Sequence, residues 1–71
     1  MHRFLIVIEK AKKNYSAYSP DLPGCIATGA THAQVEKNMT AAIKFHIDGL
    51  KEDSKKIPVS SSFAEYIAIS A

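Results

Sequence analysis

The stretch YSAYSPDLPGCIATGAT, residues 15–31, decides how this 71-residue chain folds. It places a Pro-Asp-Leu-Pro-Gly corner, residues 20–24, between two short runs that alternate in polarity. Pro20 and Pro23 each fix φ near about −65° and lack a backbone N–H, so a strand cannot continue through them. Gly24 can adopt the backbone conformations that such a corner demands. The pattern predicts a stiff turn between two strands and favours a recognition surface over a flexible linker.

Three strands and a helix are predicted around that corner. Residues 4–8, FLIVI, are apolar at every position, which is typical of a strand buried on both faces. Residues 15–19 and 25–29 are the second and third strands. The helix is predicted to begin at Thr31, an N-cap residue followed three positions later by Gln34, as in a capping box.

Apolar side chains at spacings of three and four then define one face of the helix. They are Val35, Met39, Ala42, Ile43, His46, Ile47 and Leu50. After this face ends, residues 63–70 again alternate and predict a last strand.

The predicted fold class is α+β, a single domain over residues 1–71 with two layers and the order β-β-β-α-β. A right-handed crossover from the third strand through the helix gives the sheet order 3-2-1-4, with residues 4–8 at its centre. One helix covers only one face of such a sheet. The other face is also apolar, so we predict a homodimer, a higher even-numbered oligomer such as a tetramer, or a partner protein that covers it.

Composition narrows the function classes. Nine basic and seven acidic residues give a net charge of +2, too balanced for a typical nucleic-acid-binding protein. The single cysteine, Cys25, allows no intrachain disulfide and fits a reducing compartment. The longest N-terminal apolar run has five residues, so neither a secretory signal nor a membrane span is predicted, and we expect a cytoplasmic protein.

The run from Tyr15 to Cys25, with Ala27, Gly29 and Thr31 after it, resembles the signature of the HicB-like antitoxin family. The resemblance continues through Asn38, Ala42, Ile43, His46 and Leu50 to Ile57-Pro58, and covers residues 4–58. It implies a small, partial RNase H-like domain that binds and neutralises a HicA-type toxin, a small ribonuclease that cleaves mRNA.

This sequence differs from the family pattern at three places. Asn14 stands where Gly is common, but Asn also tolerates positive φ. Ser60 to Ser62 replace a more proline-rich segment. The sequence ends at Ala71, without the C-terminal DNA-binding module of many family members, so no specific DNA binding by this chain alone is expected.

The residues predicted to contact the toxin or another partner lie in and beside the corner. They are Tyr18, Pro20, Asp21, Leu22 and Pro23. On this hypothesis Asp21 pairs with a basic surface, Leu22 makes an apolar contact beside it, and the toxin is masked sterically. The alternative is that both residues serve the fold, with Asp21 capping turn N–H groups and Leu22 tucked under the helix.

Catalysis is not predicted. RNase H-like nucleases hold Mg²⁺ with carboxylates that converge on one cavity, and no carboxylate lies inside residues 4–8. We therefore expect a protein that is not an enzyme and has no metal or other cofactor. The alternative function is a stand-alone oligomeric regulatory or nucleic-acid-binding module without a toxin partner, using Lys10, Lys12 and Lys13.

Overall fold

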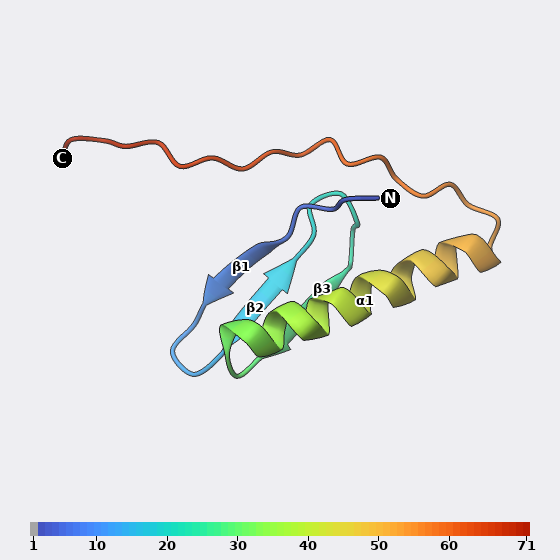
Figure 1. Cartoon of the computed structure of the whole chain (residues 1–71), viewed down its shortest axis with the longest axis horizontal. Helices are drawn as coiled ribbons and strands as arrows, with labels where there is room; N and C mark the ends of the chain where they lie inside the picture. Colours follow the sequence, from blue (N-terminus) through green and yellow to red (C-terminus); the bar gives the residue numbers. More distant parts are fainter. Residues whose placement is uncertain (1) are drawn as a thin grey trace.

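A three-stranded antiparallel sheet and a long helix form the folded part of residues 2–71, which the computed structural model describes. The strands are β1 (Val7–Lys10), β2 (Tyr15–Tyr18) and β3 (Ile26–Gly29), in the spatial order β1-β2-β3. Helix α1 (His32–Glu52) follows and lies across one face of the sheet (Figure 1). The α+β class, the second and third strands and the helix are as predicted, and the first strand is present with shifted bounds.

The Pro-Asp-Leu-Pro-Gly corner is held by backbone hydrogen bonds. The Leu22 N–H donates to the Ser19 carbonyl at 3.2 Å, and the Cys25 N–H donates to the Leu22 carbonyl at 3.0 Å. Gly24 has a φ of +80°, a conformation that side-chain-bearing residues rarely adopt. The corner therefore consists of two successive tight turns, and both prolines occupy positions where no N–H is needed.

Both ends of α1 are capped. The Thr31 hydroxyl accepts from the Gln34 N–H at 3.0 Å, which confirms Thr31 as the N-cap. The helix extends two residues beyond Leu50 and ends in a Schellman arrangement, in which the Lys55 N–H donates to the Leu50 carbonyl and the Ser54 N–H donates to the Lys51 carbonyl. Ser54 has a φ of +56° there, at a position that usually holds glycine.

The core lies between the sheet and α1. Leu22, Val35 and Met39 are completely buried, and Ala17 and Cys25 complete the buried cluster. The sheet and the helix approach so closely at Gly29 that a Cβ there would lie 2.5 Å from the Val35 nitrogen. The absence of a side chain at that position is what allows the first turn of α1 to rest on β3.

The predicted fourth strand is not part of this sheet. Residues 59–71, here called the C-terminal arm, are extended but have no strand pairing within residues 2–71. In Figure 1 the arm runs in the same general direction as β1 and continues beyond the end of the sheet. The order 3-2-1-4 and the RNase H-like arrangement are therefore not confirmed, and β1 lies at an edge instead of at the centre.

The start of the arm makes its contacts with the corner, not with β1. The hydroxyl groups of Ser60, Ser61 and Ser62 all donate to the Asp21 carboxylate, at 3.1, 3.2 and 2.9 Å. These contacts hold the arm at the corner, and beyond them its backbone does not approach β1 closely enough to pair. The predicted first strand also shifts, because pairing with β2 begins only at Val7.

Candidate partner-binding surface

The sheet face that points away from α1 carries an exposed apolar row. Val7 lies opposite Tyr18, and Tyr18 lies opposite Ile26, so the three side chains form one line across the three strands. Tyr18 is 42% exposed and Ile26 is 70% exposed. We call these three residues the open-face row.

The neighbouring positions on the same face are polar. Glu9 lies opposite Ser16, and Ser16 lies opposite Thr28. An apolar patch bordered by polar residues is typical of a protein-binding surface. The position of Ile26 was missed by sequence reasoning. The alternation of side chains along β3 could have predicted it: Ala27 faces the helix and is half-buried, so its neighbour Ile26 must face the other way.

The corner continues this surface at the Tyr18 end of β2. Pro20, Pro23 and Gly24 are exposed, whereas Ser19 is buried and its hydroxyl donates to the Leu5 carbonyl at 2.9 Å. That bond ties the corner to the segment that leads into β1. The exposed residues of the corner are therefore attached to the folded domain through this partly buried hydrogen bond.

The five residues predicted to bind a partner are placed differently. Tyr18, Pro20 and Pro23 are exposed, and Asp21 is half-exposed. Leu22 is completely buried in the core. This placement of Leu22 matches the alternative in which it serves the fold, while partner binding by the set as a whole remains a prediction.

The Asp21 carboxylate accepts hydrogen bonds from the hydroxyl groups of Ser60, Ser61 and Ser62, as described above. The hydrogen bond from Ser62 lowers the pKa of Asp21 most, and partial burial of the carboxylate acts in the opposite direction. Sequence reasoning missed this contact, because 39 to 41 residues separate the partners and only the unusual Ser60–Ser62 run signals it.

The nucleophilic and titratable side chains are dispersed. Cys25 is buried and free, and burial raises the pKa of its thiol, which favours the protonated and less nucleophilic form. His32 pairs with Glu36 at 2.9 Å on the exposed side of α1. Within residues 2–71, no group of three or more His, Cys, Asp or Glu side chains lies together as metal ligands would.

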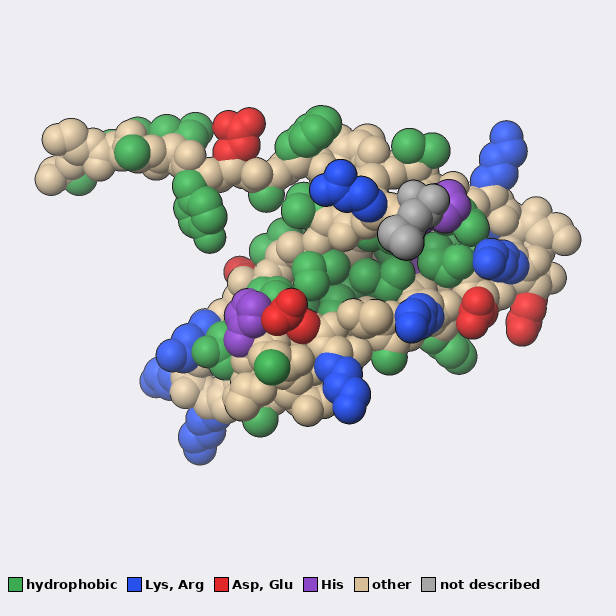
Figure 2. Space-filling view, viewed as in Figure 1, with side chains coloured by type: hydrophobic (Ala, Val, Ile, Leu, Met, Phe, Trp, Pro, Cys, Tyr) green, Lys and Arg blue, Asp and Glu red, His purple; other side chains and the backbone are tan. Residues whose placement is uncertain are grey.

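Lysines gather at the end of the molecule where β1 turns into β2. Lys10, Lys12 and Lys13 are all exposed there. Figure 2 shows basic side chains at that end and hydrophobic ones between the helix and the C-terminal arm. No helix in the described part of the chain is long and apolar enough to cross a membrane.

Comparison with known proteins identifies the family to which this chain belongs. A family model described as the HicB-like antitoxin of bacterial toxin–antitoxin systems matches residues 4–70. The chain belongs to the HicB-like antitoxin family. The match includes the sheet, the corner, α1 and nearly all of the C-terminal arm, so the arm is part of the HicB-like domain.

Two relatives of this HicB-like chain are similar over most of its length. An uncharacterized 14.9 kDa protein from the rep–hol intergenic region of Haemophilus phage HP1 is 40% identical over 62 residues, which is 87% of this chain. A UPF0150 protein of Helicobacter pylori is 33% identical over 67 residues, 82% of this chain. The matches span 47% of the phage protein and 93% of the Helicobacter protein. No solved structure matches the chain.

Proposed function

We propose that this protein binds a small HicA-type toxin ribonuclease and neutralises it by covering its RNA-binding or catalytic surface. The observation that carries the proposal is the open-face row, in which Tyr18 and Ile26 are exposed and Val7 is half-buried, beside a rigid corner in a member of an antitoxin family.

Rigidity makes this surface suitable for tight binding. The two turns of the corner and the bond from Ser19 to Leu5 hold the exposed groups in place before a partner arrives, so little conformational entropy is lost on binding. Tyr18 supplies the kind of aromatic anchor that dominates many protein interfaces. Because Leu22 is buried, the apolar contacts in this proposal come from Tyr18 and Ile26.

The proposed mechanism is steric and needs no chemistry from the antitoxin. It requires only that the bound surface overlap the site where the toxin holds RNA, which makes a non-enzymatic role sufficient. The proposal includes the cytoplasm as the place of action, because the toxin's substrate is mRNA. It also includes an oligomeric antitoxin, a homodimer or tetramer.

The test is co-expression with a small HicA-type toxin ribonuclease. The variant Tyr18→Ser with Ile26→Ser should lose rescue of growth and co-purification of the toxin, while its melting temperature stays close to that of the wild type. The matched control is Phe45→Ser on the outer side of α1, where an aromatic residue is 82% exposed and away from the open face. The control should neutralise the toxin normally.

Two results would contradict the proposal. Full neutralisation by the open-face variant would place the toxin elsewhere on the molecule. Sequence-selective binding of nucleic acid by the purified chain, abolished when Lys10, Lys12 and Lys13 are replaced by alanine, would instead favour the stand-alone regulatory function.

A further inference from the structure

The C-terminal arm exposes most of its large apolar side chains. Tyr66 is fully exposed, and Ile67 is 78% exposed. The other strongly exposed members are Val59, Phe63 and Ile69. Such a density of exposed apolar side chains on one short segment indicates a surface that is covered in the assembled protein.

The outer edge of β1 is the complementary feature. Among residues 2–71, β1 pairs only with β2, so its other side presents backbone N–H and C=O groups without a sheet partner. Phe4 and Ile6, on the segment leading into β1, pack against the core cluster. An edge of this kind is a ready template for another strand.

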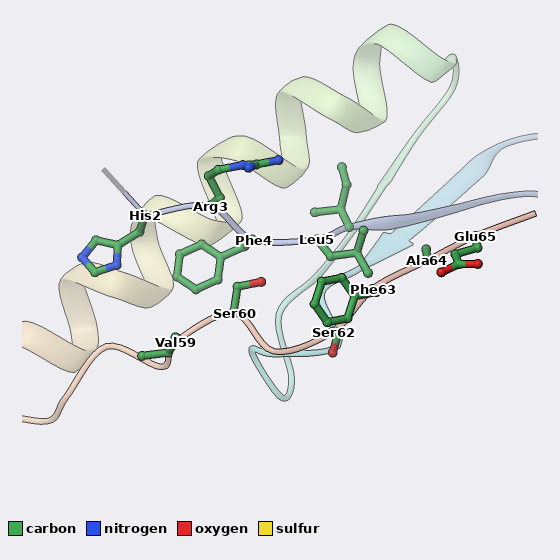
Figure 3. Close-up of a pocket in the computed structure, with 11 residues that line it drawn as sticks. His2, Arg3, Phe4, Leu5, Val59, Ser60, Ser62, Phe63, Ala64 and Glu65 are labelled. Carbon is green, nitrogen blue, oxygen red and sulfur yellow. The ribbon is translucent and has the colours of Figure 1, made fainter.

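The arm of the same chain does not fill this edge. It passes alongside, leaving cavities of about 790 and about 300 Å³ between itself and residues 2–8. Figure 3 shows Phe63 and Ser60 of the arm facing Phe4 and Leu5 across the larger of these spaces. Paired strands lie only about 4.8 Å apart, and within residues 2–71 the arm has no such pairing with β1.

The start of the arm is nevertheless fixed. The hydrogen bonds from Ser60, Ser61 and Ser62 to Asp21 hold it at the corner, and the remainder projects past the sheet (Figure 1). The molecule consequently measures 49 Å along its longest axis and only 27 Å and 19 Å along the others. Ile67 and Ile69 lie on this projecting part and are 78% and 76% exposed.

We propose that residues 63–70 of one copy add as a parallel strand to the β1 edge of a second copy, and that the second copy returns the same contact. Each sheet then has the order 3-2-1-4, with the fourth strand supplied by the partner copy. This exchanged homodimer does not depend on toxin binding, and Val7 is the one member of the open-face row that lies beside the arm.

Three features of the chain favour a second copy as the occupant over an unrelated protein. Phe63, Glu65, Ile67 and Ile69 share one face of the extended arm, and the three apolar members of that face match the apolar helix side of the edge formed by Phe4 and Ile6. The family match runs through residue 70, so the exchanged strand belongs to the same domain as the edge that receives it. Reciprocal exchange closes the assembly at two copies and removes both open edges.

The first experiment measures mass by light scattering at micromolar concentration. The wild type should have a mass of twice 7.8 kDa, and Ile67→Asp should raise the dimer dissociation constant by at least about ten-fold. Phe45→Asp is the matched control, because it places the same charge at a similarly exposed apolar position on α1. A wild-type monomer, or equal effects of the two variants, would overturn the proposal.

The second experiment distinguishes exchange from closure within one chain. Val7 and Tyr66 line the same cavity, so cysteines replacing them can report which chain's arm lies on the edge. Chains carrying Val7→Cys alone and Tyr66→Cys alone, distinguished by tags and mixed before oxidation, should form a mixed disulfide dimer. Buried Cys25 should not compete. An intramolecular disulfide in the doubly substituted chain, with no mixed dimer from the single variants, would show closure within one chain and refute exchange.

Discussion

Residues 7–52 and the C-terminal arm differ in how completely each buries its large apolar side chains. In the former, the strands, the corner and α1 enclose Leu22, Val35 and Met39 completely. In the arm, Phe63, Tyr66 and the isoleucines stand exposed on a backbone without sheet pairing in the described residues. The difference teaches that the core side chains of residues 7–52 are packed within one copy of the chain, whereas the large apolar side chains of the arm are not.

The largest difference in stability between the two regions is expected when a core side chain is removed. Leu22→Ala should lower the free energy of unfolding by about 2–5 kcal/mol, because it leaves a cavity beneath the corner. Val59→Ala, at an exposed position of the arm, should change it by less than about 0.5 kcal/mol. Urea denaturation of both variants checks the ranking, and equal losses would mean that the arm belongs to the same cooperative core.

The next effect concerns the contact between β3 and α1. Gly29→Ala should destabilise by about 1–3 kcal/mol, because the new Cβ would be forced against the backbone of Val35. Gly49→Ala is the matched control, since a Cβ at this helical position meets nothing within 4 Å and should stabilise by about 0.5–1 kcal/mol. Thermal melts should show a lower melting temperature for Gly29→Ala and a higher one for Gly49→Ala. An unchanged melting temperature for Gly29→Ala would show that the helix can move away from the sheet.

A smaller effect is expected at the start of α1. Thr31→Ala removes the hydroxyl that accepts the Gln34 N–H and should cost about 0.5–2 kcal/mol. Thr31→Asp keeps an acceptor at the N-cap and should retain most of the stability. Loss of helical circular dichroism at lower urea concentration for the alanine variant alone would support the cap, and identical curves for the two variants would contradict it.

Local signals account for the parts of the fold that the sequence could predict. The corner prolines, the Thr31 cap and the apolar face of α1 each act within a few residues. The corner and the cap lie where they were expected, and five of the seven predicted face residues pack in or against the core, all except His46 and Leu50. Residues 63–70 have an equally clear alternation, but strand pairing depends on a distant edge, and alternation does not say which edge or which copy supplies it.

The candidate surface was predicted in part for a related reason. Proline chemistry located the corner, and Tyr18 and the two prolines are exposed there. The sequence pattern does not predict that Leu22 is buried while Ile26 is exposed. Both side chains are apolar, and their burial depends on where α1 packs. The contact between Asp21 and the serines was likewise invisible, because it joins two segments about forty residues apart.

The smallest expected effect concerns that contact, which is the link between the two regions. The hydrogen bond from Ser62 lowers the folded-state pKa of Asp21, so the contact stabilises the docked arm above the unfolded pKa and is lost as pH falls through the lower, folded value. With an ordinary aspartate pKa of about 3.9, the change should occur below about pH 4. The backbone amide signals of Ser60 to Ser62 in NMR spectra should shift there, while those of Val35 and Met39 in the core stay in place. In Asp21→Asn the serine signals should lose this pH dependence, because the amide does not titrate. If core and serine signals instead move together in the wild type, the arm does not detach separately, and the two regions respond to acid as one unit.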